Sequence, residues 1–402
     1  MDTQNLHPEV LKIKDFIINI RRQIHQYPEL AYEEHQTSDL IKSHLIEFGY
    51  QVIPNVGKTG LVGILKGEKQ GPCYLLRADM DALLVQENSG DPYSSKIPGK
   101  HHACGHDGHV AMLLGLAKII KDWHKKIHGT VKLCFQPAEE GGAGAKKMIE
   151  DPKYPVLENP SVDMCFGIHL LNNYYPGTII SCSGPITGNS DRFQINIQGL
   201  GGHGSLPNQC KDALVIGCQL VCNFQTIISR NVFPGEQATI CVGKITSGSG
   251  GGNIIASDCE IIGGFRSNNK KARSLLIKRM QDICNGLAIA YECQIKFEYQ
   301  LLYDVVVNDQ KAFNIIEKTA KKVVGEKNFI YNNFGLAGED FTFFSQKVPS
   351  GFLMVGSAPE NSIQEEKVLR PHHSPFFTID EKSILIGTSF WVQFIEDQMV
   401  NI

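Results

Sequence analysis

In the first part of this 402-residue chain, segments whose hydrophobic residues have helical spacing alternate with short apolar runs typical of strands. Helical spacing of apolar residues covers residues 8–27, 37–48 and 110–120, and short apolar strands are expected at 73–76, 130–135 and 164–168. Strands that alternate with helices predict a mostly parallel sheet with helices on both faces. We therefore expect an α/β fold for this part.

A different pattern begins near residue 187. Strands are expected at 192–198, 237–246, 254–265 and 293–299, and helices at 212–229 and 269–290. That order is β-α-β-β-α-β, the split unit of a ferredoxin-like α+β domain. The chain then returns to the first pattern, with a helix at 310–324, a strand at 352–355 and a helix from residue 381. We expect residues 186–300 to be inserted into a first domain that is built from 1–185 and 301–402.

The composition is that of an ordinary globular protein, with 42% hydrophobic and 20% charged residues. The formal net charge of -3 gives no reason to expect nucleic acid or a membrane surface as a partner. Charged residues interrupt the first twenty positions, so we expect no signal peptide and a cytoplasmic location. The 12 cysteines are scattered without a Cys-x-x-Cys pair, and no Gly-x-Ser-x-Gly motif or phosphate-binding loop occurs.

Residues 102–109 read His-Ala-Cys-Gly-His-Asp-Gly-His and enter the apolar helix at 110–120. Such a density of thiol and imidazole groups suits zinc or a similar ion, and Cys104 and His106 could reach one metal. The alternative is a buried polar turn whose groups bond to one another. Asp107 could cap the helix or orient a neighbouring side chain.

Polar residues also follow the predicted strands, at the sheet edge where functional groups of α/β proteins collect. They are Asp79, Asp81, Glu139, Glu140 and His169. Adjacent carboxylates repel, so one glutamate could bind a cation while the other acts as general base on a metal-bound water. The pair could equally be solvated at the start of a loop, and Asp81 could orient a ligand histidine or cap a helix.

Several candidate residues each have a functional and a structural interpretation. His169, His372 and His373 could each be a metal ligand or a hydrogen-bonded structural residue. His203 lies in a glycine-rich loop that is either functional or a mobile tip of the inserted domain. Asn253 and Arg266 flank a strand of that domain, and Arg266 could clamp a substrate carboxylate or form a surface ion pair.

Seven stretches together resemble the aminoacylase–carboxypeptidase family of di-metal hydrolases. They are 77–83, 102–109, 135–140, 167–169, 201–203, 338–341 and 373–375. The resemblance is strongest to the branch of hippurate hydrolases, N-acyl-amino-acid amidohydrolases and auxin-conjugate hydrolases. Departures from the usual pattern at Leu84-Val85, Ala256 and His372 concern substrate details more than chemistry.

The resemblance implies a ligand set for two divalent ions per subunit: Cys104, His106, Glu140, His169 and His373. Zinc or manganese is expected, with cobalt or nickel also compatible. Glu139 would be the catalytic base and Asp81 would orient a ligand. His203 would polarise the scissile carbonyl, and Asn253 and Arg266 would hold the substrate.

The implied activity is hydrolysis of the amide bond of N-acyl amino acids by a metal-bridged hydroxide, which yields a carboxylic acid and a free amino acid. The first domain would be catalytic, and the inserted domain would serve as a lid and would form a homodimer or a higher oligomer. The alternatives are a dipeptidase or aminopeptidase on the same scaffold, a catalytically silent binding protein, and a redox-sensing role for Cys104.

Overall fold

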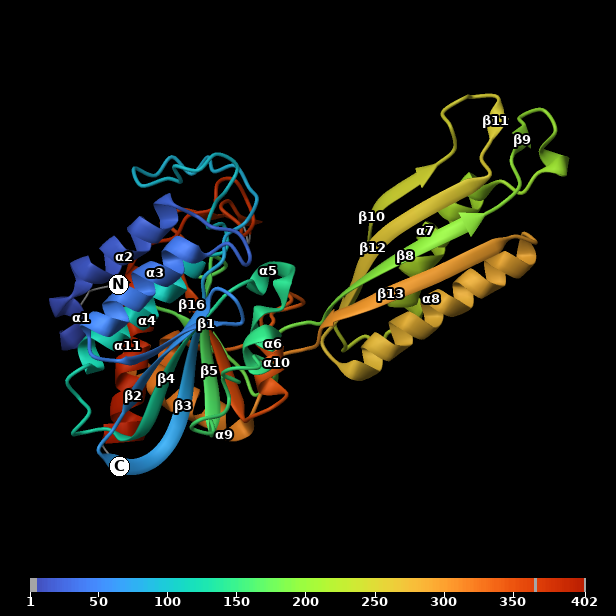
Figure 1. The fold of residues 1–402 in the computed structure, drawn as a ribbon. Helices are drawn as coiled ribbons and strands as arrows, with labels where there is room; N and C mark the ends of the chain where they lie inside the picture. The colour runs from blue at the N-terminus through green and yellow to red at the C-terminus, as the bar shows by residue number, and fades with distance from the viewer. Residues whose placement is uncertain (1–5, 365–366, 401–402) are drawn as a thin grey trace. The chain divides into compact units, whose positions relative to one another are not determined.

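The computed structural model describes residues 6–364 and 367–400. The chain divides into two compact units (Figure 1). Unit 1 contains the chain up to Gly184, Val307–Asn333 and the chain from Asp340 onward, and unit 2 contains Pro185–Val306 and Phe334–Glu339. Two short strands, β7 (Gly184–Pro185) and β14 (Val307–Asn308), lie where the chain leaves and re-enters unit 1.

Unit 1 is built on an eight-stranded sheet in the order β1-β2-β4-β3-β5-β16-β6-β15. Its strands are β1 (Gln51–Val56), β2 (Gly60–Lys66), β3 (Lys69–Asp79), β4 (His128–Gln136), β5 (Met164–Leu171), β6 (Ile179–Ser181), β15 (Phe329–Tyr331) and β16 (Ser350–Gly356). The four central strands β4, β3, β5 and β16 pair in parallel. A mostly parallel sheet in an α/β fold is therefore confirmed.

Helices cover both faces of this sheet. The helices are α1 (Pro8–Lys12), α2 (Lys14–Gln26), α3 (His35–Glu47), α4 (His106–Ile120), α5 (Glu139–Gly142), α6 (Gly144–Ile149), α9 (Gln310–Val324), α10 (Thr342–Ser345) and α11 (Lys382–Ile395). In β4, Leu133 joins the core that contains α4, while Cys134 on the opposite face contacts Met148 of α6. A strand that is buried on both faces is typical of parallel sheets.

Some strands of unit 1 are absent from the sequence-based expectation. The edge strands β1 and β2 pair antiparallel, and β2 adds antiparallel to β4. The β2 segment is a short run that is apolar on both faces, and such a run cannot be told from a buried helix by periodicity. The helix that was expected at 8–27 is interrupted at Ile13 into α1 and α2.

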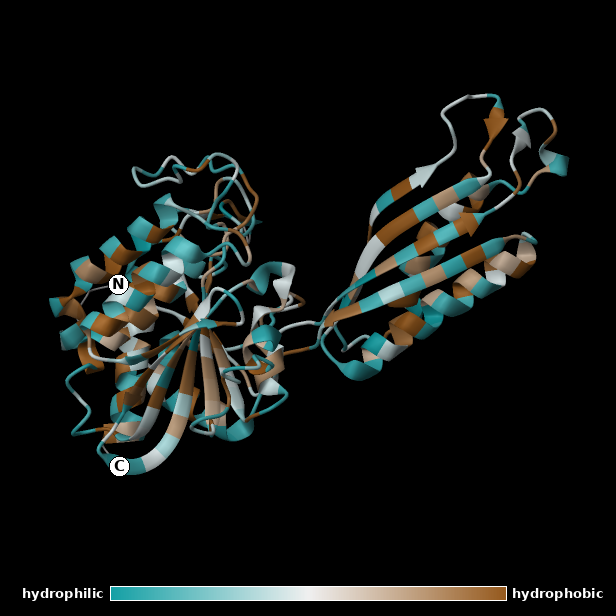
Figure 2. Ribbon diagram, viewed as in Figure 1, coloured by the Kyte–Doolittle hydropathy of each residue, from teal (hydrophilic) through white to brown (hydrophobic). Residues whose placement is uncertain are grey.

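Unit 2 has the ferredoxin-like order that the sequence predicts. Its main elements are β8 (Ser190–Gln198), α7 (Ala213–Asn231), β10 (Ala238–Ser247), β12 (Asp258–Ser267), α8 (Lys270–Ala290) and β13 (Gln294–Tyr303). The sheet order is β10-β12-β8-β13, and the core between sheet and helices includes Ile195, Phe224 and Leu276. Apolar and polar residues alternate along β8, so one sheet face is apolar and the other polar (Figure 2). The strand expected at 254–265 is divided into β11 (Ile254–Ile255) and β12, and β11 pairs with β9 (Gly202–His203).

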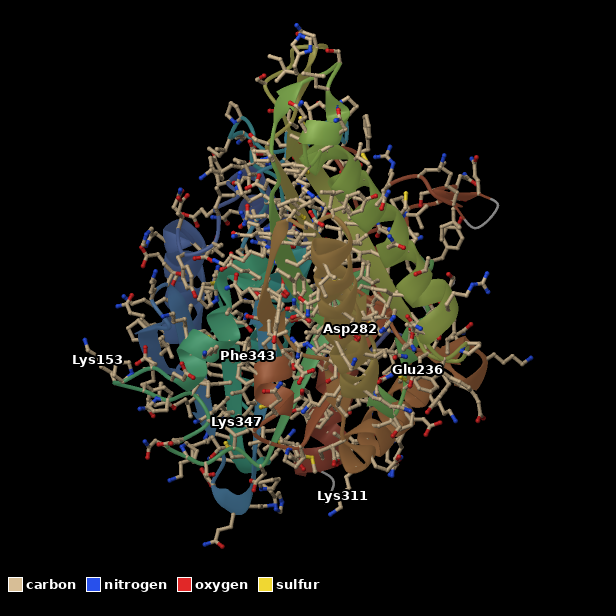
Figure 3. The ribbon with its side chains drawn as sticks, turned by 90° about the vertical axis from the view of Figure 1, so that its right-hand side faces the viewer. Lys153, Glu236, Asp282, Lys311, Phe343 and Lys347 are labelled. Atoms are coloured by element: carbon tan, nitrogen blue, oxygen red, sulfur yellow. The ribbon has the colours of Figure 1, made fainter. Side chains whose placement is uncertain are left out.

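The two helices of unit 2 differ in their outer faces. In α8, Asp282 (Figure 3) pairs with Lys278 at 2.6 Å and Arg279 at 2.8 Å. In α7, by contrast, Leu214 and Val215 are 46% and 45% exposed. Among the described residues, α7 is the one helix whose length and apolar composition would suffice to cross a bilayer, but its inner face packs in the core of unit 2.

Candidate metal centre

The first two candidate ligands lie on a tight turn at the start of α4. Gly105 stands between Cys104 and His106 with φ 88°, a left-handed conformation that glycine adopts without steric cost. The helix that follows is buried along almost its whole length. The apolar helix thus anchors a turn whose two ligand-type side chains are themselves buried.

The paired glutamates lie beyond the end of β4 in a segment with irregular backbone. Ala138 has φ 52°, and its N–H donates to Glu34 Oε1 at 2.9 Å. The backbone N–H groups of Glu139 and Glu140 donate to Asp81 Oδ1 and Oδ2, each at 3.0 Å. Two buried carboxylates therefore hold this segment in a conformation that its residues would not adopt alone.

The remaining two candidate ligands come from far along the chain. His169, on β5, donates from Nδ1 to the carbonyl of Leu170 at 2.6 Å, which places the lone pair on Nε2. That Nε2 lies 3.6 Å from Cys104 Sγ. His373 has φ 63°, its N–H donates to the carbonyl of Ala103 at 2.8 Å, and its Nε2 lies 3.1 Å from Glu140 Oε1.

These side chains converge on one place in unit 1. Ligand atoms lie within 4.8 Å of one another in three overlapping groups: Cys104, His106 and His169; Cys104, Glu140 and His373; and His106, Glu139 and Glu140. His106 donates from Nδ1 to the carbonyl of Asp81 at 2.9 Å, while its buried Nε2 makes no hydrogen bond. Buried Glu140 Oε1 has the ion-pair contact with His373 Nε2 but no hydrogen bond of good geometry. Thiol, imidazole and carboxylate donors with such unsatisfied atoms fit divalent cations.

The electrostatics of the cluster favour added positive charge. Burial, together with the carboxylates of Glu140 and Glu139, raises the pKa of the Cys104 thiol well above its ordinary value. Burial lowers the pKa of His106, but Asp79, Asp81 and Glu140 outweigh it and raise that pKa to about 10. The cluster thus retains protons that a metal ion would replace.

Asp79 and Asp81 contact the two different ring nitrogens of His106. Asp79 Oδ2 lies 3.5 Å from Nε2, and Asp81 Oδ1 lies 3.3 Å from Nδ1. Asp79 also accepts from His109 Nδ1 at 2.5 Å, and His109 Nε2 accepts from the N–H of Leu170 at 2.9 Å. Both ring nitrogens of His109 are therefore engaged in hydrogen bonds, which link α4 to β3 and to β5.

Of the two roles expected for Asp107, capping of the helix is wrong, and the contacts of its carboxylate agree with the other, orientation of neighbouring side chains. Gly105 occupies the N-cap of α4, and no side chain caps the helix there. Asp107 is buried and accepts from Arg21 Nε at 2.7 Å, with His25 Nδ1 at 2.8 Å. Its carboxylate neutralises the buried guanidinium of α2 instead, so it ties α2 to α4.

Two residues that support the centre were not found by sequence reasoning. Asp340 accepts from Gln136 Nε2 at 2.8 Å and from Arg77 Nη2 at 3.0 Å, and its own N–H lies 3.3 Å from Glu139 Oε1. Glu34 holds Ala138, as described above. The acidic Gly-Glu-Asp stretch at 338–340 was a signal for Asp340, whereas nothing local in the sequence distinguishes Glu34.

The three candidate residues of unit 2 do not form one cluster within that unit. His203 lies on β9, where its Nδ1 accepts from Ser205, and the N–H of Gly204 donates to the carbonyl of Asn253 at 2.8 Å. His203 and Asn253 therefore both lie near the end of β12 that begins at Asp258. Arg266 lies near the other end of β12, beside Gly338. Eight residues of extended strand separate the two ends by roughly 27 Å.

The chain is similar to known proteins over most of its length. The sequence pattern of the family described as peptidase family M20/M25/M40 matches residues 75–397. The chain is 38% identical over 390 residues to hippurate hydrolase of Campylobacter jejuni (97% of this chain, 98% of the relative). It is 36% identical over 379 residues to IAA-amino acid hydrolase ILR1-like 4 of Arabidopsis thaliana (93% and 84%). A solved structure of Bacillus subtilis YXEP, described as a dinuclear metal-binding peptidase, superposes with a TM-score of 0.81 at 29% identity, covering 96% and 98% of the two chains.

Proposed function

The chain belongs to peptidase family M20/M25/M40, a family of amide-bond hydrolases, and from this we propose that it hydrolyses N-acyl amino acids to a carboxylic acid and a free amino acid. The observation that carries the proposal is the convergence of five ligand-type side chains with a sixth group, Glu139, placed among them. The relatives that are named for hippurate and auxin conjugates support this substrate class.

In this proposal Cys104, His106, Glu140, His169 and His373 hold two divalent ions. When bound, such ions lower the pKa of water and polarise a carbonyl oxygen. The thiolate of Cys104 favours zinc, while the imidazole and carboxylate donors also accept manganese, cobalt or nickel.

Glu139 is the proposed general base. Asp81 accepts from the backbone N–H of Glu139, and Glu139 Oε1 lies 3.3 Å from the N–H of Asp340, so both the backbone and the carboxylate of Glu139 are held. Glu139 would accept the proton of the attacking water and deliver it to the leaving nitrogen. Because that role needs an ionisable group at this position, replacement by an amide should abolish turnover.

His203, Asn253 and Arg266 are proposed to act on the substrate from unit 2. His203 would stabilise the oxyanion, and Arg266 would bind the substrate carboxylate through its planar fork. The separation along β12 means that one copy of unit 2 cannot place both groups on the same small substrate. We therefore assign His203 and Arg266 at any one centre to two different copies of the chain.

A homodimer through unit 2 follows from this assignment. The outer face of α7 exposes Leu214 and Val215, and β10 lies at the edge of its sheet. Exposed apolar residues on a helix beside an open sheet edge are typical of a contact surface between chains. A cytoplasmic location fits the twelve free thiols, which would persist in a reducing compartment.

A substrate panel tests the proposed function. Metal-loaded protein should release amino acid from hippurate-like and other N-acyl substrates faster than it cleaves dipeptides with a free amine. Faster cleavage of dipeptides would favour the peptidase alternative. If protein with its full metal content hydrolysed no substrate of the panel, the alternative of a catalytically silent binding protein would be favoured.

The redox alternative for Cys104 is tested separately by thiol labelling. Burial and the raised pKa keep this thiol protonated, so alkylation after metal removal should be slower than at the exposed Cys218 and Cys222. Rapid labelling of Cys104 in the metal-free protein would favour redox sensing instead.

A further inference from the structure

A second group of ligand-type side chains lies in unit 1, and it shares no residue with the metal centre. His25 comes from α2, Glu87 from the irregular segment after β3, and His101 from the residues before the Cys104 turn. One ligand atom from each lies within 4.8 Å of the other two. The three residues are 0%, 8% and 0% exposed. We refer to them as the His25 cluster.

Both ring nitrogens of His101 are buried and make no hydrogen bond. A buried imidazole without a partner loses its hydration and gains nothing in return, so such atoms in native proteins indicate a bound water or ion. Burial lowers the pKa of His101 to about 4, and the ring is therefore neutral with a lone pair available for coordination.

The spacing of the ligand atoms fits one metal ion. His25 Nε2 lies 3.3 Å from Glu87 Oε1, and His101 Nε2 lies 3.7 Å from the same oxygen. The second distance is too long for a hydrogen bond. Donors that each lie about 2.0–2.1 Å from a tetrahedral zinc ion are about 3.3 Å apart, which is close to both separations.

The surrounding contacts orient these donors. His25 Nδ1 lies 2.8 Å from Asp107 Oδ2, so its N–H can donate there and leave the lone pair on Nε2. This carboxylate–histidine pair is the arrangement that commonly supports a metal-binding imidazole. Glu87 Oε2 accepts from the N–H of Ser95 at 2.6 Å. Glu87 Oε1 accepts from the hydroxyl of Ser89, which fixes this oxygen beside the two imidazoles.

Charge also favours a cation at the cluster. The nearby Arg21 pairs with Asp107 at 2.7 Å and with Glu381 at 3.3 Å. Among the described residues, the ion pairs of Glu87 are with His25 and His101 alone. The buried carboxylate of Glu87 therefore needs either a proton on His25 or a metal ion.

We propose that His25 Nε2, Glu87 Oε1 and His101 Nε2 bind a third divalent ion, zinc by its donor set, with water in the fourth position. The ion joins α2, the segment after β3 and the turn that carries Cys104. Its role is structural, because it fixes the turn from which Cys104 and His106 project.

Metal counting on the full-length protein tests this proposal. After loading with zinc and exhaustive dialysis, elemental analysis should find about three zinc ions per chain, two at the metal centre and one at the His25 cluster. His101→Leu and the isosteric Glu87→Gln should each lose one zinc ion. His124→Leu, which removes a half-exposed imidazole elsewhere, should lose none.

A variant of the metal centre separates this proposal from the proposed function. Cys104→Ala combined with Glu140→Ala should empty the metal centre but retain one zinc ion at the His25 cluster. Equal zinc content in the parent protein and in folded Glu87→Gln and His101→Leu would overturn the proposal, because the cluster would then hold only a proton or water. Circular dichroism establishes that each variant is folded.

Discussion

The carboxylate of Asp81 accepts a hydrogen bond from the backbone N–H of Glu139 at 3.0 Å, although 58 residues separate them in the chain. Its second oxygen accepts from the N–H of Glu140 at the same distance. One buried side chain thus fixes the backbone of the proposed base and of a proposed ligand. The role expected for Asp81 was to orient a ligand histidine or to cap a helix; the structure shows it beside His106 and on the N–H groups at the start of α5.

Removing this carboxylate should weaken metal binding. Asp81→Ala leaves two N–H groups without their charged acceptor, and loss of such supporting contacts reduces metal affinity by about 10–100-fold. Asp81→Asn retains one acceptor oxygen, so its metal affinity should lie between those of the parent protein and Asp81→Ala. Competition with a chelating dye measures the affinities, and an unchanged affinity in Asp81→Ala would contradict this role.

Metal binding should release protons and strengthen as the pH rises. The pKa of His106 is about 10 and that of Cys104 is well above its ordinary value, so both are protonated at neutral pH without metal. Ligation requires the deprotonated forms, so about two protons should leave per chain on loading. Calorimetry in buffers of different ionisation enthalpy counts these protons. A pH-independent affinity between pH 6 and 9 would refute the assignment of these ligands.

The ligands that lie in one motif or directly after a predicted strand could be predicted from the sequence. The supporting contacts between residues far apart in the chain could not. Cys104 and His106 lie on one turn whose composition alone indicates a metal, and the predicted strands place Glu140 and His169 at the same sheet edge. Glu34 reaches Ala138 across 104 residues, and Asp340 reaches Gln136 across 204. No spacing rule brings such residues together, because their contacts depend on the completed packing of unit 1.

The long elements of the fold could be predicted from the sequence, and its shortest strands could not. Long periodic segments such as α7, α8 and α9 agree with the expected helices within a few residues. The strands β6 and β15 contain only three residues each, too few for a period of two to stand out. The His25 cluster also escaped notice, since its members are separated by up to 76 positions and only His101 adjoins the ligand-rich motif at 102–109.

Two adjacent arginines should differ greatly in their effect on stability. Arg21 is buried between Asp107 and Glu381, whereas the side chain of Arg22 is 42% exposed and pairs with Glu381. Arg21→Met removes the guanidinium that neutralises the buried carboxylate of Asp107 and leaves it only the contact with His25, so it should reduce the free energy of unfolding by about 3–5 kcal/mol. Arg22→Met serves as the control and should cost about 0–1 kcal/mol. Urea unfolding of both variants measures the difference, and equal losses would contradict the account.

A charge on the outer face of α7 should separate the proposed dimer. Leu214→Asp places a carboxylate in the apolar contact, while Ile289→Asp alters an 80% exposed residue of α8 and serves as the control. Sedimentation should show a monomer for Leu214→Asp and a dimer for the parent protein and for Ile289→Asp. Activity should fall with dissociation, because His203 and Arg266 would no longer meet at one centre. A parent protein that sediments as an active monomer would exclude this assignment.

Glu139 is proposed to act as the base at a two-metal centre without being needed to hold the metals. The decisive measurement is the turnover of an N-acyl amino acid by Glu139→Gln, with its metal content determined on the same sample. We expect an unchanged metal content and a kcat reduced by about 100-fold or more. Parental turnover with full metal content would contradict the claim. A loss of metal together with activity would show that Glu139 is a ligand instead.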